Sequence, residues 1–185
     1  MKNILQIFII LISLTACESK KSHSVEKKEA KSEIKAQKVE LTEREKEEKL
    51  RTKINSDYIA ELSKCSQNTN AVTNFNGKTE FWEICETDQG KRILKIESHK
   101  KTELYEEVYY EQNGELIYAE ESIKYMPINH HVLQTWTCQF YIEKGKLVSL
   151  MSLGHGKTEN ENWNPEIIFE MYKKRIIELN KIAKE

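Results

Sequence analysis

Apolar and polar residues alternate along most of residues 71–153, and a period of two is typical of β-strands with one buried face. Gly next to a polar residue separates the alternating runs at positions 76–77, 89–90, 113–114 and 144–145, and this pairing suits tight hairpin turns. The pattern predicts seven strands, near residues 71–75, 79–86, 91–98, 103–112, 115–125, 132–143 and 146–153. In the clearest run, residues 132, 134, 136, 138, 140 and 142 share the face expected at the centre of the core.

Apolar residues recur every three to four positions at both ends of this region, as they do in amphipathic helices. Thr42-Glu43-Arg44-Glu45 has the form of a capping box, and the stripe from Leu50 to Leu62 predicts a helix that ends near Lys64. Asn164-Pro165 suits the start of a second helix, whose stripe runs from Ile168 to Ala183. The fold class predicted is α+β: an antiparallel meander of about six or seven strands packed by an N-terminal and a C-terminal helix.

The first residues form a pattern of another kind. Met1-Lys2-Asn3, an apolar run from Ile4 to Leu14 and small residues before Cys17 are the parts of a secretory signal. The apolar run is shorter than the roughly 20 residues that cross a bilayer. The segment resembles a bacterial lipoprotein signal with the lipobox Leu14-Thr15-Ala16-Cys17. The resemblance implies that residues 1–16 are removed and that Cys17 carries a covalent diacylglycerol and an acyl chain such as palmitate.

Three regions follow from these patterns: a signal peptide at 1–16, a lipidated cysteine with a flexible tether at 17–41, and one α+β domain at 42–185. Residues 18–41 contain no aromatic residue and few apolar ones, so they cannot bury enough surface to offset the entropy of ordering. We expect a membrane-anchored protein of the cell envelope. Glu18-Ser19-Lys20-Lys21 is not the strongly acidic run of known surface-export signals, which favours a position facing the periplasm.

The net charge of -1 conceals a division along the chain. Residues 18–53 hold twelve Lys and Arg against nine Asp and Glu, whereas residues 54–185 hold sixteen against twenty-one. A basic tether is attracted to anionic lipid. An acidic body argues against nucleic acid as a partner, because neutralisation of phosphates supplies most of that affinity.

Cys65, Cys85 and Cys138 remain once Cys17 is lipidated, and an odd number in an exported protein leaves at least one outside an intramolecular disulfide. A Cys85–Cys138 disulfide is plausible because both residues lie in predicted strands. The sequence does not choose among the three possible pairs, and three buried or free thiols are an equal alternative. Cys138 lies between Trp136 and Phe140 on the predicted core face, which favours packing over catalysis.

Residues 109–117 align without gaps on residues 140–148, at an offset of 31. Two aromatic residues, a polar turn with Gly, a charge, Leu and a β-branched residue recur in both. This is similar to the tandem hairpins of many uncharacterised bacterial envelope lipoproteins, and more loosely to MORN-like hairpins. Two hairpins that use the same turn chemistry independently are an equal explanation.

Two groups of polar residues are candidates for chemistry. His130, His131 and His155, with His99, are weak candidates for a metal site, since no metal-ligand spacing supports them. Carboxylate pairs serve in glycoside hydrolysis, but the glutamates of one predicted hairpin fit a solvated acidic face better. These glutamates are Glu103, Glu106, Glu107, Glu111, Glu115, Glu120 and Glu121.

The sequence therefore favours a lipid-anchored protein without enzymatic activity that binds an envelope protein or component through its sheet. We expect Tyr105, Tyr109 and Tyr141 to be exposed on that binding face. Small lipoproteins that inhibit lysozymes are one such type, although their motif is not recognisable. The alternatives are an envelope hydrolase, metal-dependent through the histidines, and a protein that only spaces the envelope.

Overall fold

The computed structural model describes residues 41–65, 69–75, 77–87, 90–100, 102–125 and 134–182, all within one compact unit that spans Glu40–Glu185. Its elements are α1 (Glu43–Leu62), β1 (Thr69–Phe75), β2 (Lys78–Thr87), β3 (Lys91–Lys100), β4 (Glu103–Gln112), β5 (Glu115–Tyr125), β6 (Gln134–Glu143), β7 (Lys146–Gly154), the 3-10 helix η1 (Lys157–Glu159) and α2 (Ile167–Ile182). None of the helices in these ranges is long and apolar enough to cross a bilayer.

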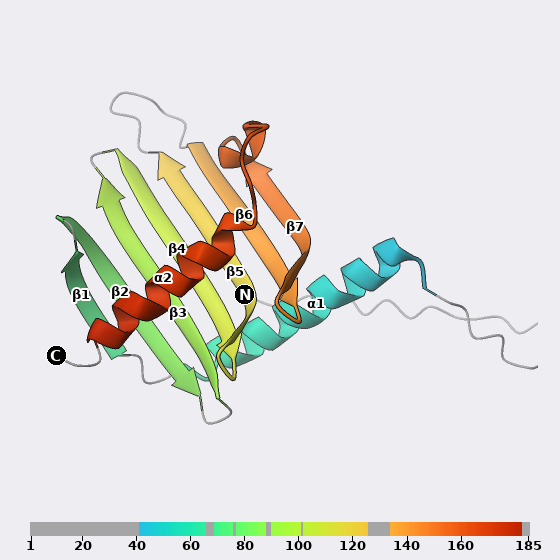
Figure 1. Cartoon of the computed structure of the whole chain (residues 1–185), viewed down its shortest axis with the longest axis horizontal. Coiled ribbons are helices and arrows are strands. Elements are labelled where there is room, and N and C mark those ends of the chain that lie inside the picture. Colours follow the sequence, from blue (N-terminus) through green and yellow to red (C-terminus); the bar gives the residue numbers. More distant parts are fainter. Residues whose placement is uncertain are drawn as a thin grey trace, which may run out of the picture. The chain divides into compact units, whose positions relative to one another are not determined.

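The seven strands form one antiparallel sheet in which every strand pairs with its neighbours along the chain, in the order β1 to β7. Helix α2 crosses one face of the sheet diagonally, and α1 lies against the other face (Figure 1). The predicted α+β meander with a helix at each end is confirmed. The two helices thus cover one face of the sheet and part of the other.

The core consists of two layers because both faces of the sheet are apolar. On the α2 side, Ile168 and Leu179 pack against a cluster that includes Trp82, Leu94, Tyr109, Trp136, Cys138, Phe140 and Ile142. On the α1 side, Ile54 packs against Cys85, Ile93, Val108, Tyr110, Tyr118 and Tyr141. The predicted core face of β6 is therefore confirmed at Trp136, Cys138, Phe140 and Ile142, and on its second face Tyr141 is buried as well.

The repeated segments, residues 109–117 and 140–148, form equivalent hairpins. At each turn a non-glycine residue and a glycine both have positive φ: 53° and 80° at Asn113 and Gly114, and 52° and 71° at Lys144 and Gly145. The strand register then shifts after Tyr110 in one hairpin and after Tyr141 in the other, which are matching positions. Each shift inserts one residue into the second strand and raises its local twist. The repeat is therefore a structural one.

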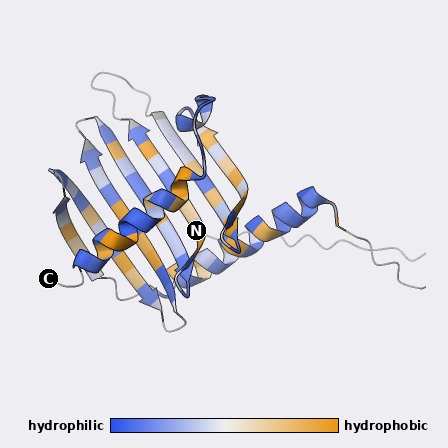
Figure 2. Cartoon of the chain, in the orientation of Figure 1, coloured by the Kyte–Doolittle hydropathy of each residue, from blue (hydrophilic) through white to orange (hydrophobic). Residues whose placement is uncertain are grey.

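Helix α1 is capped as predicted and is held to the sheet by few contacts. The Thr42 hydroxyl accepts a hydrogen bond from the backbone N–H of Glu45, and the Glu45 carboxylate accepts one from that of Thr42. Farther along, Arg51 donates to Ser149 at 2.9 Å and Asn55 to the hydroxyl of Tyr141 at 3.1 Å. The first turns extend past β7 and are hydrophilic (Figure 2). Helix α1 therefore covers the sheet only from about Leu50 onward.

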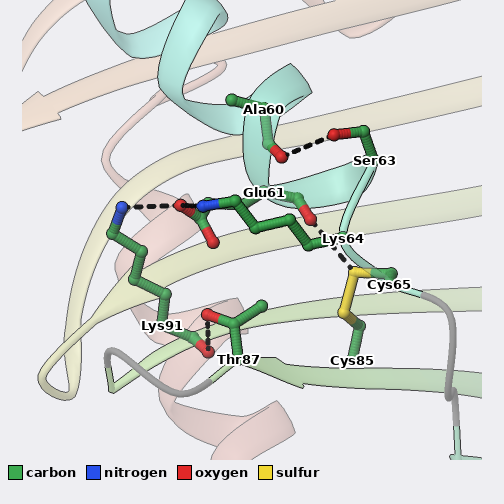
Figure 3. Close-up of a disulfide and its surroundings, with 8 residues drawn as sticks. All are labelled: Ala60, Glu61, Ser63, Lys64, Cys65, Cys85, Thr87 and Lys91. Carbon is green, nitrogen blue, oxygen red and sulfur yellow. Dashed lines mark hydrogen bonds and ion pairs between the residues drawn. A yellow bond between two sulfur atoms is a disulfide. The ribbon is translucent and has the colours of Figure 1, made fainter.

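A disulfide joins the end of α1 to β2 (Figure 3). It links Cys65 to Cys85, whose Cα atoms are 5.6 Å apart, and Cys138 is a buried free thiol. The Cys85–Cys138 pairing was thus wrong: Cys85 lies on the α1 face of the sheet and Cys138 on the α2 face. Beside the disulfide, the buried carboxylate of Glu61 accepts hydrogen bonds from Lys64 and Lys91, each at 2.8 Å. These two lysines lower the pKa of Glu61 to about 2.

We expect Cys65→Ala to lower the free energy of unfolding by about 3 kcal/mol, because the disulfide closes a loop whose ends are 20 residues apart. Thermal unfolding with and without a thiol reductant provides the measurement. Reduction should lower the melting temperature of the wild-type protein and leave that of Cys65→Ala unchanged. A wild-type protein that is insensitive to the reductant would show that the disulfide does not hold α1.

Candidate functional site

The three tyrosines predicted to form a binding face do not lie on one face. Tyr105 and Tyr109 lie on the α2 side of the sheet, whereas Tyr141 lies on the α1 side. Tyr109 and Tyr141 are fully buried, and Tyr105 is partly buried. The prediction was wrong because helices cover both faces, so alternation along a strand does not distinguish a solvated face from a buried one.

The predicted solvated acidic face is also divided between the two sides of the sheet. Glu107 and Glu121 are direct partners across β4 and β5, and only 3% and 0% of these residues is exposed. Glu111 is buried nearby, where it accepts from Tyr172 and pairs with Arg92 at 2.7 Å. Glu103, Glu106, Glu115 and Glu120 are partly or fully exposed. Three of the seven glutamates are therefore part of the interior, where each has a hydrogen-bonding partner.

Arg175 of α2 is the centre of a buried ionic network beneath that helix. Its guanidinium donates two hydrogen bonds to Glu107, at 2.7 and 2.9 Å, and two to Glu80 of β2, at 2.9 and 3.1 Å. Glu178, one turn along α2, accepts a further bond at 2.6 Å, and the ring of Trp82 lies 5.5 Å from the guanidinium carbon. Such forked pairs fix orientation as well as charge. The network therefore sets the position of α2 on the sheet.

A second part of the network surrounds Glu121. One of its carboxylate oxygens accepts hydrogen bonds from the hydroxyl of Tyr105 and from the ammonium of Lys157 in η1. The same ammonium lies 5.3 Å from the centre of the Tyr105 ring. The other oxygen of Glu121 is buried without a hydrogen-bond partner among the described residues. The segment that follows β7 is thus held over the sheet by this ion pair, together with the hydrogen bond that Trp136 donates to Thr158.

The pKa shifts in this network follow from burial and charge. Burial alone would raise the pKa of Glu80, but hydrogen bonds from Arg175 and Lys78 outweigh it and lower the pKa. Burial would likewise lower the pKa of Arg175, but its carboxylate partners, Glu107 first, raise it. Burial and the charge of Glu107 raise the pKa of Tyr109 well above its usual value. The network therefore holds opposite charges that stabilise each other at neutral pH.

The candidate metal ligands are not brought together in the part of the chain that the structure describes. His130 and His131 lie outside the described residues. His155 is exposed and bonds to Glu159, which raises the pKa of its imidazole, and His99 packs edge-on against Phe81. Among described residues, no group of three or more His, Cys, Asp or Glu side chains is placed to hold a metal ion.

Cys138 is fully buried in the core, as its predicted packing role requires. Burial, with the charge of Glu121 across the strand pair, raises the pKa of its thiol to about 12. A thiol with so high a pKa holds almost no thiolate at neutral pH, and the thiolate is the nucleophile. Cys138 is therefore unsuited to nucleophilic catalysis.

The α1 side of the sheet holds a second candidate surface, which we call the outer face. It consists of two rows of cross-strand partners that run across all seven strands, next to the part that α1 covers; Val108 and Ser122 within these rows are buried. One row is Val72, Phe81, Glu97, Glu106, Ser122, Thr137 and Leu153, and the other is Asn70, Glu83, Lys95, Val108, Glu120, Gln139 and Met151. Exposed apolar residues lie at both ends: Val72 is 66% exposed, Phe81 47%, Met151 49% and Leu153 80%.

The middle of the outer face is acidic. Its two rows contain four glutamates and one lysine, and Lys95 bridges Glu97 at 2.9 Å and Glu106 at 3.1 Å. Burial opposes the charge of Lys95, but the two carboxylates raise its pKa. A groove of about 240 Å³ lies next to this bridge, between Phe81 and Lys95. An acidic groove with an aromatic wall suits a cationic side chain, whose stem packs on the ring while its charged end meets a carboxylate.

The sequence contains a recognisable signal for the buried network, although the sequence analysis did not identify it. Arg175 falls on the apolar stripe of α2, between Tyr172 and Leu179, where a charge must have a buried partner. The outer face gave no such signal, because its residues alternate with buried ones along the same strands. No protein-family model, curated protein or solved structure significantly matches the chain.

Removal of Arg175 tests whether the network determines how α2 docks. We expect Arg175→Met to lower the free energy of unfolding by about 3–5 kcal/mol, because Glu80 and Glu107 then lose their shared cation. Lys174→Met, at an exposed neighbouring position, should change it by less than about 0.5 kcal/mol. Chemical denaturation at pH 7 measures both.

The same pair of variants has a pH signature. The lowered pKa of Glu80 means that its stabilising contribution is present above the ordinary carboxyl pKa and is lost as the pH falls through the lowered value. In Arg175→Met the burial of Glu80 is opposed only by Lys78, so its protonation costs less. The difference in free energy of unfolding between the wild-type protein and Arg175→Met should therefore become smaller between pH 7 and pH 4. A difference that stays constant over this range would contradict the role of Arg175 as the cation for Glu80.

Proposed function

We propose that the mature protein is a lipid-anchored component of the bacterial cell envelope whose body binds another protein or envelope component without catalysing a reaction. The N-terminal pattern supports the anchor, with Cys17 as the lipidated residue and the body facing the periplasm. The observation that carries the binding role is the outer face. Large apolar side chains exposed beside a groove mark an interaction site more often than a solvated surface.

The charge of the outer face indicates what its partner presents. Four glutamates and one lysine in its two rows leave a negative excess, and exposed apolar side chains flank it. A partner that carries basic groups next to apolar ones is complementary to this arrangement. Such complementarity contributes to selectivity and to the rate of association more than to affinity. The buried network under α2 keeps the sheet rigid behind this surface.

The anchor is tested by substitution of the lipidated cysteine. We expect the Cys17→Ser protein to lack the diacylglycerol and acyl groups. It should then be absent from the membrane fraction that detergent extracts, because no lipid holds it there. Cys65→Ala, which changes a cysteine of the body, should stay in the membrane fraction. Cell fractionation with mass spectrometry of the purified chain gives both readouts. A Cys17→Ser protein that keeps its lipid mass would rule out this anchor.

The outer face is tested by photo-crosslinking in cells. A photoreactive phenylalanine analogue at position 81 should give one discrete adduct. The same analogue at Ile177, an equally exposed residue on the opposite side of the sheet (52% exposed), should not. Glu97→Lys should reduce the adduct from position 81 at least tenfold, because it reverses the charge beside the groove. Equal adducts from both positions would mean that the outer face is not the binding surface.

A further inference from the structure

Among the residues that the structure describes, strand β1 is an edge of the sheet that lacks the usual protection against pairing. Its sequence, Thr-Asn-Ala-Val-Thr-Asn-Phe, has no charged residue and no proline, and its register with β2 is regular throughout. Natural edge strands normally carry a lysine, a proline or a bulge, because an unprotected edge exposes backbone groups that pair with another strand. The opposite edge, β7, begins with Lys146 and contains the register shift of its hairpin. Of the two edge strands, β1 is thus the one that has no lysine, proline or bulge.

The side chains of β1 are arranged symmetrically about Val72. Asn70 and Asn74 lie two residues to either side of it, on the same side of the sheet, and all three are exposed. In an antiparallel pair of two β1 strands centred on Val72, each Asn70 lies opposite Asn74 of the second strand. An amide both donates and accepts hydrogen bonds, so each Asn pair is complementary, and the two valines meet at the centre. The strand is therefore complementary to itself.

We propose that β1 pairs antiparallel with β1 of a second copy of this chain, around a two-fold axis at Val72, so that the two sheets form one continuous sheet. The closed two-fold arrangement uses the same patch on both copies and leaves no further β1 edge. No charged residue of β1 opposes the contact. The axis is perpendicular to the sheet, so both outer faces and both α1 helices lie on the same side of the dimer. Val72 and Asn70 also belong to the outer face, so the dimer brings the grooves of the two copies next to the two-fold axis.

The test uses the full-length, membrane-anchored chain with single cysteines introduced in β1. Directly opposed residues in an antiparallel pair have Cα atoms about 4.5–5.5 Å apart, which is within the range that a disulfide spans. Val72→Cys should therefore form a disulfide-linked dimer when membranes are treated with a mild oxidant. Asn70→Cys is the matched control, because its two copies would be separated by four residues, or about 13 Å along the strands. We expect at least tenfold more dimer from Val72→Cys than from Asn70→Cys.

Co-expression makes the register itself testable. Asn70→Cys and Asn74→Cys, carrying different affinity tags, should form a mixed disulfide, because the proposed register places these positions opposite each other. Maleimide labelling of a separate, unoxidised sample establishes that each introduced thiol is accessible, and a melting temperature equal to that of the wild type establishes that each variant is folded. Failure of Val72→Cys to crosslink, or equal crosslinking of Asn70→Cys alone, would overturn the proposal. Neither result depends on whether Phe81 crosslinks to another protein.

Discussion

The position of the C-terminal helix depends on a single charge placed where water does not reach. Arg175 is buried between α2 and the sheet, and its forked hydrogen bonds to Glu80 and Glu107 join strands that are not neighbours in the chain. A buried cation tolerates little displacement, because every lost hydrogen bond leaves an unpaired charge in a medium of low dielectric. The network therefore disfavours arrangements of α2 that would separate Arg175 from Glu80 and Glu107.

The two faces of the sheet differ in how completely they are covered, and this difference locates the proposed function. Helix α2 and η1 occupy the face that holds most of the aromatic core. Helix α1 contacts only the end of the other face that is close to the hairpin turns. The outer face remains, with an acidic centre and apolar ends. Rigid support on one side and accessible residues on the other are what a binding surface requires.

Much of this fold could be predicted from sequence because its elements use local rules. The strands were placed within about two residues by alternation and by glycine turns, and the capping box at Thr42 fixed the start of α1. The binding tyrosines could not be predicted, because alternation does not reveal whether one face of a sheet or both are covered. The Cys65–Cys85 pairing depends on where α1 docks, which is a tertiary contact. The extent of the outer face likewise depends on which part of the sheet α1 covers, which is also a tertiary contact.

The disulfide also sets an order of events for a chain exported as its N-terminal pattern predicts. Thiols stay reduced in the cytosol and are oxidised in the compartments beyond the membrane. Without the disulfide, the end of α1 is held to the sheet by noncovalent contacts such as the ion pair of Glu61 with Lys91 of β3. The covalent link is made after passage, when the sheet already brings Cys85 within reach of Cys65. In a chain exported in this way, the form closed by the disulfide would therefore exist only beyond the membrane.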